Sequence, residues 1–463
     1  MSEARIGVYV CRCGSNIAAA VDCEDVANFA KSLPNVALSK VTTYTCSDQS
    51  QSDMRRDIAE EKLDRVVVAS CSPRLHEATF RKTCEEAGLN KYLFEMANIR
   101  EHCSWVHLHA GREATEKAKD LVRMAVAKVR LLEPQTELEV PVLKKALVVG
   151  GGVAGVQASL DLADTGFRVY LVEKSASLGG TMAQLDKTFP TMDCSICILG
   201  PKMSDVGRHP NIELLTCAEV KEVNGYVGNF KVRVEKRPRY IDLKKCNLCD
   251  ECTKVCPVEV PSEYDARLSW RKAIYLPFPQ AVPSCYVLDE QSCLGFSADS
   301  CGRCKTVCEP DAIDYDDTSK IVELEVGTII VATGAQPYDP KALDKYGYLK
   351  HANVLTPLEV ERLVNAGGPT KGQLVRPSDG KIPGRIAFIQ CVGFRSEKEG
   401  KEYCSNICCM NTVKQSLLIK EHWPETEIYA FYMDIRAFGK GFESLLRRAK
   451  REGIRFVRGL PAE

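Results

Sequence analysis

The stretch from Lys144 to Lys174, KKALVVGGGVAGVQASLDLADTGFRVYLVEK, decides the fold of the middle of this chain. The apolar run Ala146–Val149 predicts a buried strand, and Val153–Gly166 has the apolar spacing of a helix. A second apolar run, Val169–Val172, predicts the next strand. Strand, glycine-rich turn, helix and strand in this order favour a bound dinucleotide over a merely structural turn.

The three glycines of the GxGxxG spacing have separate tasks. Gly150 permits the tight turn, Gly152 lets a pyrophosphate approach the backbone, and Gly155 lets the helix pack closely on the strand. The first helical residues, Val153 and Ala154, lie at the positive end of the helix dipole and offer free N–H groups to phosphates.

An acidic residue comes directly after the second strand. Glu173 follows the glycines by about twenty residues, the distance at which a carboxylate accepts hydrogen bonds from a ribose hydroxyl. Lys174 stands beside it as a further cofactor-binding candidate.

Two later motifs bear on which dinucleotide binds. Gly179–Thr181, which includes Gly180, is similar to the GG motif that flavoproteins of the disulfide-reductase type place near the cofactor pyrophosphate. Ala332, Thr333 and Gly334 end a predicted strand and resemble the second flavin-contacting motif of that superfamily, although a strand-to-loop turn alone has the same sequence pattern. In Leu214–Val223 the likeness implies a backbone contact to adenine near Val220. Together these motifs favour FAD over NAD.

The composition indicates which binding partners and which chemistry are expected for this chain. Of 463 residues, 62 are basic and 62 acidic, so net charge gives no hint of nucleic acid or of an anionic membrane. There is no apolar run of the length of a membrane span and no signal peptide, so we expect a soluble, cytoplasmic protein. Twenty-three cysteines in a reducing compartment indicate metal or redox chemistry rather than a disulfide scaffold. An oxygen-poor habitat follows as a hypothesis.

The predicted fold class is α/β, in four segments. Residues 1–135 form an N-terminal doubly wound α/β domain, and the polar stretch Glu133–Pro141 links it to the rest. Residues 142–239 and 318–463 form a disulfide-reductase-like FAD domain, the latter with an incomplete nicotinamide-domain-like region. A two-cluster ferredoxin module, residues 240–317, interrupts it.

Cysteines follow three strands of the N-terminal domain. The strands are expected at Ile6–Val10, Leu38–Thr45 and Arg65–Ala69, with a fourth at Tyr92–Met96. Because sites form at the carboxyl ends of parallel strands, the following thiols should converge: Cys11, Cys13, Cys46 and Cys71. Four thiolates suffice for a cluster, but buried cysteines also pack as small hydrophobes, and both interpretations stay open. Cys103 either adds a ligand or packs, and Cys23 and Cys84 are expected to be structural.

The strongest metal signal is CxxCxxCxxxC followed by proline, at Cys246, Cys249, Cys252 and Cys256. This is the bacterial ferredoxin run, whose fourth cysteine ligates the other cluster. A partner run exists at Cys293, Cys301, Cys304 and Cys308, with a longer first gap.

The spacing therefore predicts two 4Fe–4S clusters with crossed ligands. One takes Cys246, Cys249, Cys252 and Cys308; the other takes Cys256, Cys293, Cys301 and Cys304. A pair of four-cysteine zinc sites fits the run less well. Cys285 is left over and is expected to be buried.

Cys194 and Cys197 form a CxxC pair after the glycine motifs. Disulfide-reductase flavoproteins carry a redox-active pair nearer to their GG motif, so the analogy is loose. Redox disulfide, cluster ligands and buried thiols are three open interpretations.

The C-terminal segment lacks a second GxGxxG where a nicotinamide domain would carry one. The stretch Gly384–Gly393 predicts a strand that ends near Cys391, and Cys404, Cys408 and Cys409 follow it. Four thiols in place of a phosphate loop predict a further 4Fe–4S cluster, against a redox pair plus packing cysteines. Lys414, one turn into the following helix, either points at the flavin or is a solvated helix lysine.

Taken together, these residues resemble the A-type subunits of heterodisulfide reductase, a flavin iron–sulfur family of methanogens and other anaerobes. The likeness spans essentially the whole chain and is carried by CRCG (11–14), ASCSPRLHE (69–77), NIREHCSWVH (98–107), GGGVAG, DCSIC, YVGNFKV (226–232), FPQAVP (278–283) and YCSNICC.

The resemblance implies an oxidoreductase subunit that holds FAD and several 4Fe–4S clusters and bifurcates or confurcates electrons. Implied partners are ferredoxin, B- and C-type subunits, and a hydrogenase- or formate-dehydrogenase-type donor module. Longer members carry a C-terminal ferredoxin module that this sequence lacks, which suggests a second polypeptide at that end. The alternatives are an NAD(P)H-dependent flavin iron–sulfur oxidoreductase and a non-catalytic electron relay.

Overall fold

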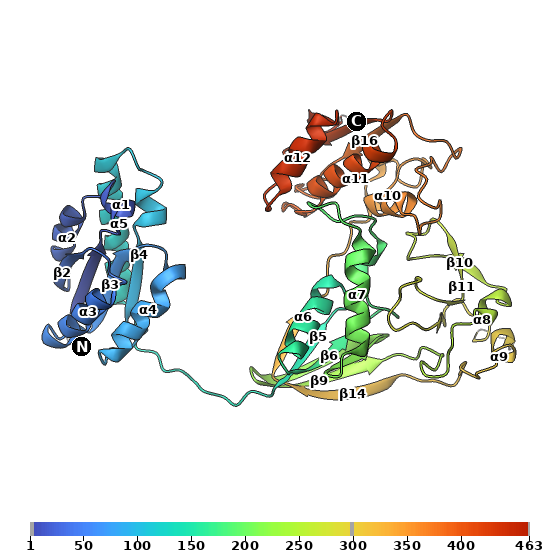
Figure 1. The fold of residues 1–463 in the computed structure, drawn as a ribbon, viewed down its shortest axis with the longest axis horizontal. Helices are drawn as coiled ribbons and strands as arrows, with labels where there is room; N and C mark the ends of the chain where they lie inside the picture. Colours follow the sequence, from blue (N-terminus) through green and yellow to red (C-terminus); the bar gives the residue numbers. More distant parts are fainter. Residues whose placement is uncertain (1–3, 297–300, 462–463) are drawn as a thin grey trace. The chain divides into compact units, whose positions relative to one another are not determined.

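The computed structural model describes residues 4–296 and 301–461, which form two compact units, Met1–Glu139 and Val140–Glu463 (Figure 1). Within those residues no helix is both long and apolar enough to cross a bilayer.

The first unit is built on a parallel four-stranded sheet. Its strand order is β2-β1-β3-β4, and the bounds are β1 Ile6–Cys11, β2 Val36–Thr42, β3 Arg65–Ser70 and β4 Phe94–Asn98. The fourth strand begins two residues later than the sequence predicts, because Leu93 belongs to the turn that starts at Asn90.

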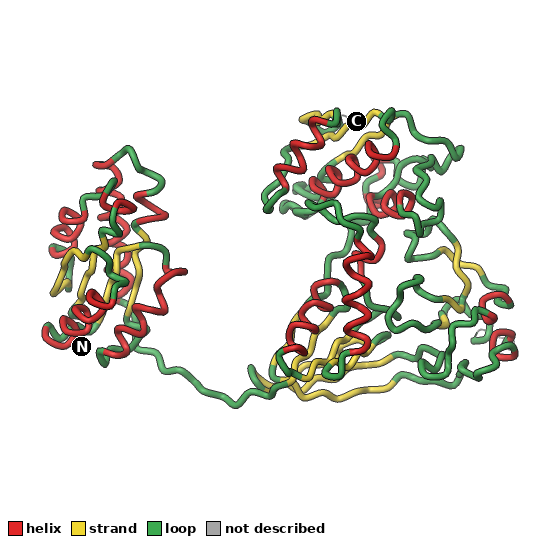
Figure 2. Tube along the Cα trace, in the orientation of Figure 1, coloured by secondary structure: helices red, strands yellow, loops and turns green. Residues whose placement is uncertain are grey.

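Helices cover both faces of this sheet (Figure 2). Side chains alternate along β1: Ile6, Val8 and Val10 pack with one set of helices, while Tyr9 packs with the other. The first set includes α2 Cys23–Lys31 and α5 Gly111–Arg130; the second comprises α3 Asp48–Glu60 and α4 Pro73–Glu86. The short α1 Ser15–Ala18 and the π-helix η1 Arg100–Ser104 complete the unit. The predicted doubly wound arrangement is confirmed.

The second unit starts with a parallel sheet of order β15-β5-β6-β7. Its strands are β5 Lys145–Val149, β6 Arg168–Val172, β7 Ile212–Leu215 and β15 Thr328–Val331. One face packs on helices α6 Val153–Asp164 and α7 Ser195–Arg208. The other face packs on an antiparallel sheet of β8 Ala218–Tyr226, β9 Asn229–Lys236 and β14 Lys320–Val326 (Figure 1). The 3₁₀ helix η2 Gly180–Gln184 follows β6.

The cysteine-rich insertion leaves and re-enters this antiparallel sheet at adjacent strand ends. β9 and β14 pair directly, with Lys236 opposite Lys320. Among the residues described between them, 237–296 and 301–319, the structure has antiparallel strand pairs and single-turn helices: β10 Glu259–Pro261 with β11 Trp270–Lys272, β12 Ile274–Tyr275 with β13 Val287–Leu288, α8 Glu251–Lys254 and α9 Arg303–Thr306.

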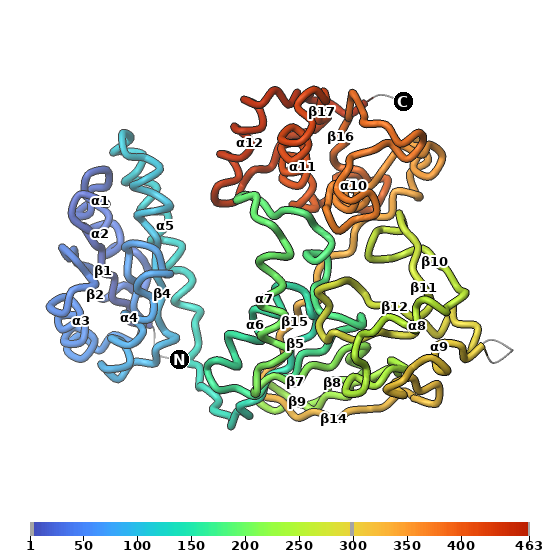
Figure 3. The backbone as a smooth tube through the Cα atoms, turned by 45° about the vertical axis from the view of Figure 1, so that its right-hand side comes forward, coloured from blue at the N-terminus to red at the C-terminus, as the bar shows by residue number. Residues whose placement is uncertain are grey.

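The C-terminal part forms a parallel sheet of order β16-β17-β18 with its own core (Figure 3). Its strands are β16 Arg385–Ile389, β17 Glu427–Tyr432 and β18 Arg455–Arg458; its helices are α10 Pro357–Val364, α11 Cys408–His422 and α12 Phe442–Arg451. Two 3₁₀ turns, η3 Pro340–Ala342 and η4 Asp344–Tyr346, precede α10. Thr356 and Glu359 cap α10 reciprocally, which fixes where the helix begins.

Candidate functional site

The glycine loop between β5 and α6 has the geometry that its sequence predicts. Gly150 has a φ of +111°, and a Cβ there would lie 2.3 Å from the Ala332 carbonyl oxygen. A Cβ on Gly155 would lie 1.8 Å from the Gly150 oxygen, so helix and turn pack too closely for any side chain. At Gly152 a Cβ would meet nothing within 4 Å. The loop therefore leaves space beside Gly152, where a pyrophosphate would approach.

The start of α6 is open to a ligand. Gly152 is its N-cap and offers no side-chain cap, while Val153 and Ala154 in the first turn are exposed. An uncapped helix N-terminus beside open space suits an anionic phosphate group.

The Gly179–Thr181 motif lies against this loop. Gly152 and Gly179 form a parallel bridge, and the Gly179 N–H donates to the Gly151 oxygen at 2.8 Å. Thr181 is exposed. The two glycine motifs, separate in sequence, thus form one surface.

Glu173 supports the glycine loop through its carboxylate. One of its carboxylate oxygens accepts from the Gly151 N–H at 2.6 Å, and the other accepts from the Ser175 N–H and hydroxyl, each at 2.7 Å. A carboxylate has about four acceptor sites, so capacity for a ribose hydroxyl remains. Lys174 is mostly exposed and pairs with Glu219 at 3.4 Å.

The remaining dinucleotide candidates divide into one group at the loop and one residue in a strand. Ala332 donates its N–H to the Val149 oxygen at 2.8 Å, which places Ala332, Thr333 and Gly334 beside the first glycine. Val220 does not lie in a turn. It is inside β8, next to an irregularity in the pairing with β9, because β8 extends to Tyr226.

The first set of ferredoxin cysteines lines a common small cavity. The cavity wall includes the four predicted ligands: Cys246, Cys249, Cys252 and Cys308. Cys308 comes from the other end of the insertion, about fifty residues beyond the CxxCxxC loop, as crossed ligation requires. Burial raises the pKa of the buried Cys285 thiol to about 12, and the neighbouring Cys246 adds to the shift, so Cys285 lies beside this set.

The second set also converges. Burial raises the pKa of Cys293, and the Cys256 and Cys301 thiols lie near enough to add to this effect. The pKa of Cys304 is raised in the same way, with Cys293 and Cys256 contributing. The Tyr315 hydroxyl lies 3.0 Å from the Cys304 sulfur. Cys256 therefore lies near thiols of the distant run. Burial, and then the nearby Cys304 thiol, raise the pKa of Cys252 to about 12, so the two sets adjoin each other.

Three of the four C-terminal cysteines are in contact. Hydrogen bonds from Cys391 and then Cys409 lower the pKa of the Cys408 thiol to about 2. Cys408 and Cys409 occupy the first turn of α11. Cys404 accepts from the Asn406 N–H at 3.3 Å; within the described residues no contact joins it to the other three.

Lys414 is not a solvated helix lysine. It is fully buried and forms an ion pair with Glu361, which is 1% exposed. Burial lowers the pKa of Lys414, and the Glu361 carboxylate opposes this shift. Glu361 also accepts from the Gln415 amide and from the Asp186 N–H at 3.0 Å. Because Asp186 follows η2 by two residues, the buried pair adjoins the segment that leads from the Gly179–Thr181 motif.

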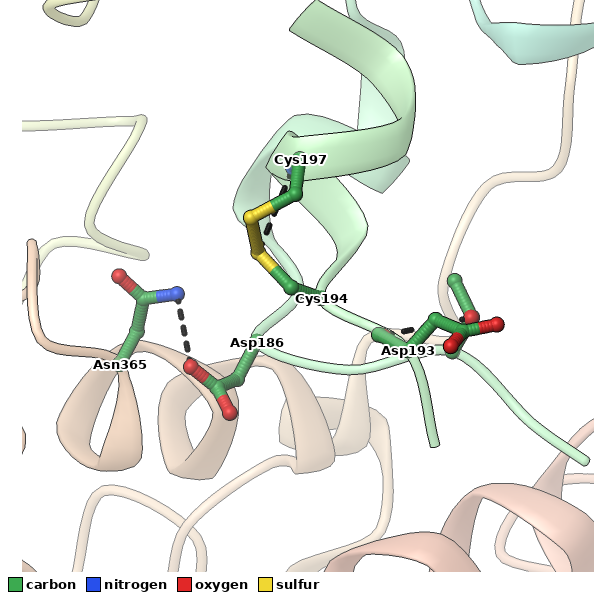
Figure 4. The surroundings of a disulfide bond; sticks show 6 residues. Asp186, Asp193, Cys194, Cys197 and Asn365 are labelled. Atoms are coloured by element: carbon green, nitrogen blue, oxygen red, sulfur yellow. Dashed lines mark hydrogen bonds between the residues drawn. A yellow bond between two sulfur atoms is a disulfide. The ribbon is translucent and has the colours of Figure 1, made fainter. Parts of the chain in front are cut away.

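Cys194 and Cys197 form a disulfide across the first turn of α7 (Figure 4). Cys194 is half-buried, Cys197 is exposed, and the Cys197 N–H donates to the Cys194 sulfur at 3.3 Å. Burial, and then the Glu361 carboxylate, raise the pKa of Asp186, whose carbonyl accepts from the Ser195 N–H. A bridged, accessible pair at a helix N-terminus favours the redox interpretation over cluster ligands.

The N-terminal thiols are neighbours at the carboxyl end of their sheet. Burial raises the pKa of Cys46, with Cys11 and then Cys13 contributing, and Cys13 also acts on the pKa of Cys71. The Arg100 guanidinium donates to the Cys13 sulfur at 3.7 Å. Three thiols remain: the Cys103 sulfur packs in the core 3.0 Å from the Ala114 oxygen, the Cys23 sulfur lies 3.7 Å from the Cys11 oxygen, and Cys84 is fully buried in the core of the other face.

Thiols that lie near one another do not by themselves form the ligand geometry of a metal site. Over residues 4–296 and 301–461, the structure arranges no three His, Cys, Asp or Glu side chains as a ready metal site. The donor set fits iron nevertheless, because thiolates are the ligands that iron–sulfur clusters use.

Comparisons with known proteins agree with this geometry. The FAD dependent oxidoreductase family model matches residues 146–193, which contain both glycine motifs and Glu173. The A-type subunit of an H2:CoB-CoM heterodisulfide,ferredoxin reductase from Methanothermobacter marburgensis is 58% identical over all of this chain and 70% of its own length. An A-type iron-sulfur subunit of the CoB–CoM heterodisulfide reductase from Methanopyrus kandleri is 60% identical, again over all of this chain and 70% of its own length. The chain belongs to the family of heterodisulfide reductase A-type subunits.

Other relatives of this family differ in the donors that their names include. The A-type subunit of the H2/formate:CoB-CoM heterodisulfide,ferredoxin reductase from Methanococcus maripaludis is 49% identical over the whole chain and 70% of its own length. Among solved structures, a thioredoxin reductase from Lactococcus lactis matches at 12% identity over 68% of this chain and 64% of its own, with a TM-score of 0.31, too weak to place any residue. The predicted family and oxidoreductase class are confirmed.

Several residues that adjoin these candidate sites were not predicted from sequence: Asp186, Glu361, Arg362 and Tyr315. The segment Pro357–Val364, PLEVERLV, held a signal, because it places charged residues among the apolar residues of a short helix. Glu361 and Arg362 are both buried, and buried charges require partners elsewhere in the fold.

Proposed function

We propose that this chain is the electron-branching subunit of a heterodisulfide reductase-type complex. It would bind FAD at the glycine loop and carry two 4Fe–4S clusters in the insertion, a third at the C-terminal cysteines and a fourth at Cys11, Cys13, Cys46 and Cys71. The observation that carries the proposal is that Cys308 shares one cavity with Cys246, Cys249 and Cys252. Such crossing is the arrangement of a two-cluster ferredoxin.

FAD supplies two-electron chemistry when bound, whereas each cluster carries one electron, so a chain that binds both is suited to divide an electron pair. The chain's own residues bind and orient this cofactor. Gly152 and the α6 N-terminus hold the pyrophosphate, and Glu173 fixes the ribose while bracing the loop. Burial makes the Lys414 ammonium easier to deprotonate, so this side chain can hold or release a proton.

The partners we propose are ferredoxin, B- and C-type subunits that reduce the heterodisulfide, and a hydrogenase- or formate-dehydrogenase-type donor. The names of the relatives, which include H2, formate, ferredoxin and the CoB–CoM heterodisulfide, support this choice. Whether electrons branch or merge depends on the potentials of these partners.

The test uses the complex purified without oxygen, with its subunits, flavin, iron and sulfide quantified. H2 or formate should reduce ferredoxin only while heterodisulfide is also being reduced, because a branching site couples the two outcomes. Ferredoxin reduction that proceeds without heterodisulfide would contradict branching. Rapid flavin bleaching by NADH or NADPH would support the NAD(P)H-dependent alternative, and iron and sulfide without flavin would support a simple relay.

The third cluster makes a separate prediction. Replacing Cys404 and Cys408 together by serine should lower the iron content by about four atoms per chain, one cubane. Iron and acid-labile sulfide assays measure this directly. The matched control is the Cys84→Ser, Cys217→Ser double variant, which removes two buried thiols outside the proposed clusters. Unchanged iron in the Cys404, Cys408 variant would instead support a redox pair with packing cysteines.

The buried Lys414–Glu361 pair gives a prediction on stability. Lys414→Met leaves the Glu361 carboxylate buried without its cation, so the free energy of unfolding should fall by about 3–5 kcal/mol. Adding Glu361→Gln should restore most of this loss, since both charges are then gone. Denaturant unfolding of the variants measures both effects.

The control for this pair lies on the same helix. Lys420→Met removes a partly exposed lysine of α11 and should change the free energy of unfolding by about 0.5 kcal/mol or less. A Lys414→Met variant as stable as this control would show that the buried ion pair does not form.

A further inference from the structure

Arg362 is the largest fully buried side chain in the part of the chain that the structure describes. It lies on α10, and its charge is matched by several partners. The guanidinium donates to Asp265 Oδ1 at 3.0 Å, to the Gln184 oxygen at 3.1 Å and to the Gly367 oxygen at 3.2 Å. It also lies over the Tyr264 ring, 4.4 Å from its centroid. Three hydrogen bonds and a ring contact account for the burial of this charge.

These partners belong to separate segments. Asp265 and Tyr264 are in the cysteine-rich insertion, Gln184 ends η2 beside the Gly179–Thr181 motif, and Gly367 follows α10. Arg362 is therefore bonded at once to the insertion, to the dinucleotide-binding part and to the C-terminal part.

The insertion and η2 are also joined directly. The Gln184 side-chain amide donates to the Glu263 oxygen at 3.1 Å and to the Tyr264 oxygen at 2.9 Å. In return the Tyr264 hydroxyl donates to the Ala183 oxygen at 2.8 Å. Tyr264 stacks on Phe278 with ring centroids 4.9 Å apart, and Phe278 belongs to the core beneath the glycine loop.

The residue before Arg362 on α10, Glu361, belongs to the buried ion pair with Lys414. Glu361 bonds Lys414, Gln415 and the Asp186 N–H. One turn of α10 thus connects the Lys414 pair through Glu361 and the insertion through Arg362, and both residues bond to the segment 184–186.

We infer that Arg362 is a positioning residue that holds the cysteine-rich insertion at a fixed distance from the dinucleotide site. In its electron-transfer part this inference rests on the proposed function. Transfer between two redox centres becomes slower as they move apart, so a rigid junction between them keeps the transfer fast. The planar guanidinium, with N–H groups in fixed directions, is essential for this junction. A lysine ammonium keeps the charge but cannot reach three acceptors in fixed directions.

The experiment compares Arg362→Lys and Asp265→Asn with the control Arg271→Lys in the full-length chain. Arg271 is also a largely buried arginine, bonded to Glu263 and Asp289 and lying 3.9 Å from the centre of the Tyr275 ring. All of these partners lie within the insertion, so the control weakens bonds inside the insertion while the hydrogen bonds of Arg362 to Asp265, Gln184 and Gly367 stay in place.

The first measurement is hydrogen exchange of peptides that span residues 181–186 and 262–268. Both test variants should exchange about tenfold faster or more at 181–186, because charged hydrogen bonds that hold this segment are lost. Arg271→Lys should leave 181–186 as in the parent. Parental exchange at 181–186 in both test variants would overturn the inference.

The second measurement is the rate at which the insertion's clusters become reduced after the flavin is photoreduced. Arg362→Lys, with flavin and iron contents unchanged, should show reduction slowed by about tenfold or more, since small misplacements are costly. Faster exchange with a parental rate of cluster reduction would also overturn the inference. A parent chain without flavin or clusters would instead refute the proposed function, and hydrogen exchange would still decide whether Arg362 holds the segments together.

Discussion

Gly152→Val is expected to abolish flavin binding while the chain still folds. A Cβ at this position would meet nothing within 4 Å, so the substitution should cost little in the fold itself. The same space is where a pyrophosphate must approach the backbone, and a valine would fill it. Flavin content after anaerobic purification, together with circular dichroism, measures both halves of this prediction.

The matched control for this variant is Gly384→Val. Gly384 also has open space around its Cβ position and an ordinary φ, and it lies before β16, away from the glycine loop. It should keep its flavin. Full flavin in Gly152→Val would mean that the dinucleotide does not lie over this loop.

Cys256→Ser should remove a cluster whose other ligands lie far along the chain. Its thiol lies near enough to Cys293 and Cys304 to act on the pKa of both. We expect the loss of about four iron atoms, one cubane. Iron analysis and electron paramagnetic resonance of the reduced chain would identify which signal disappears.

Double variants test whether Cys256 ligates the cluster of the distant run. Cys256→Ser with Cys293→Ser should lose no more iron than either alone, because both act on one cluster. Cys256→Ser with Cys246→Ser should lose about eight atoms, two cubanes. Cys217→Ser, which changes a buried thiol outside both sets, is the control. The opposite pattern of losses would show that each run ligates its own cluster.

Local signals allowed much of this site to be predicted. The glycine loop and the CxxCxxCxxxC run predict structure from spacing alone, because each places its ligating or contacting atoms within one turn. The alternating strands and helices of the first unit likewise predicted its sheet, although the last strand, Phe94–Asn98, starts later than expected.

The distant partners of the buried charged residues could not be predicted from the sequence. Lys414 looks like an ordinary helix lysine in the sequence because its partner, Glu361, lies 53 residues earlier. Arg362 bonds Asp265 at a separation of 97 residues. Nothing in the local pattern around either residue indicates which distant segment will neutralise it, since tertiary packing decides where a buried charge finds its partner.

The direct pairing of β9 with β14 means that the insertion between them can be gained or removed without changing the sheet. Lys236 and Lys320 face each other across the ladder, as two residues beside a hairpin turn would. Eighty-odd residues of cysteine-rich chain therefore occupy the place of a tight turn, and the sheet beneath them is continuous. A sequence can gain or lose such a segment as one piece, so ancestors with a plain hairpin at this point are compatible with the same flavin-binding core.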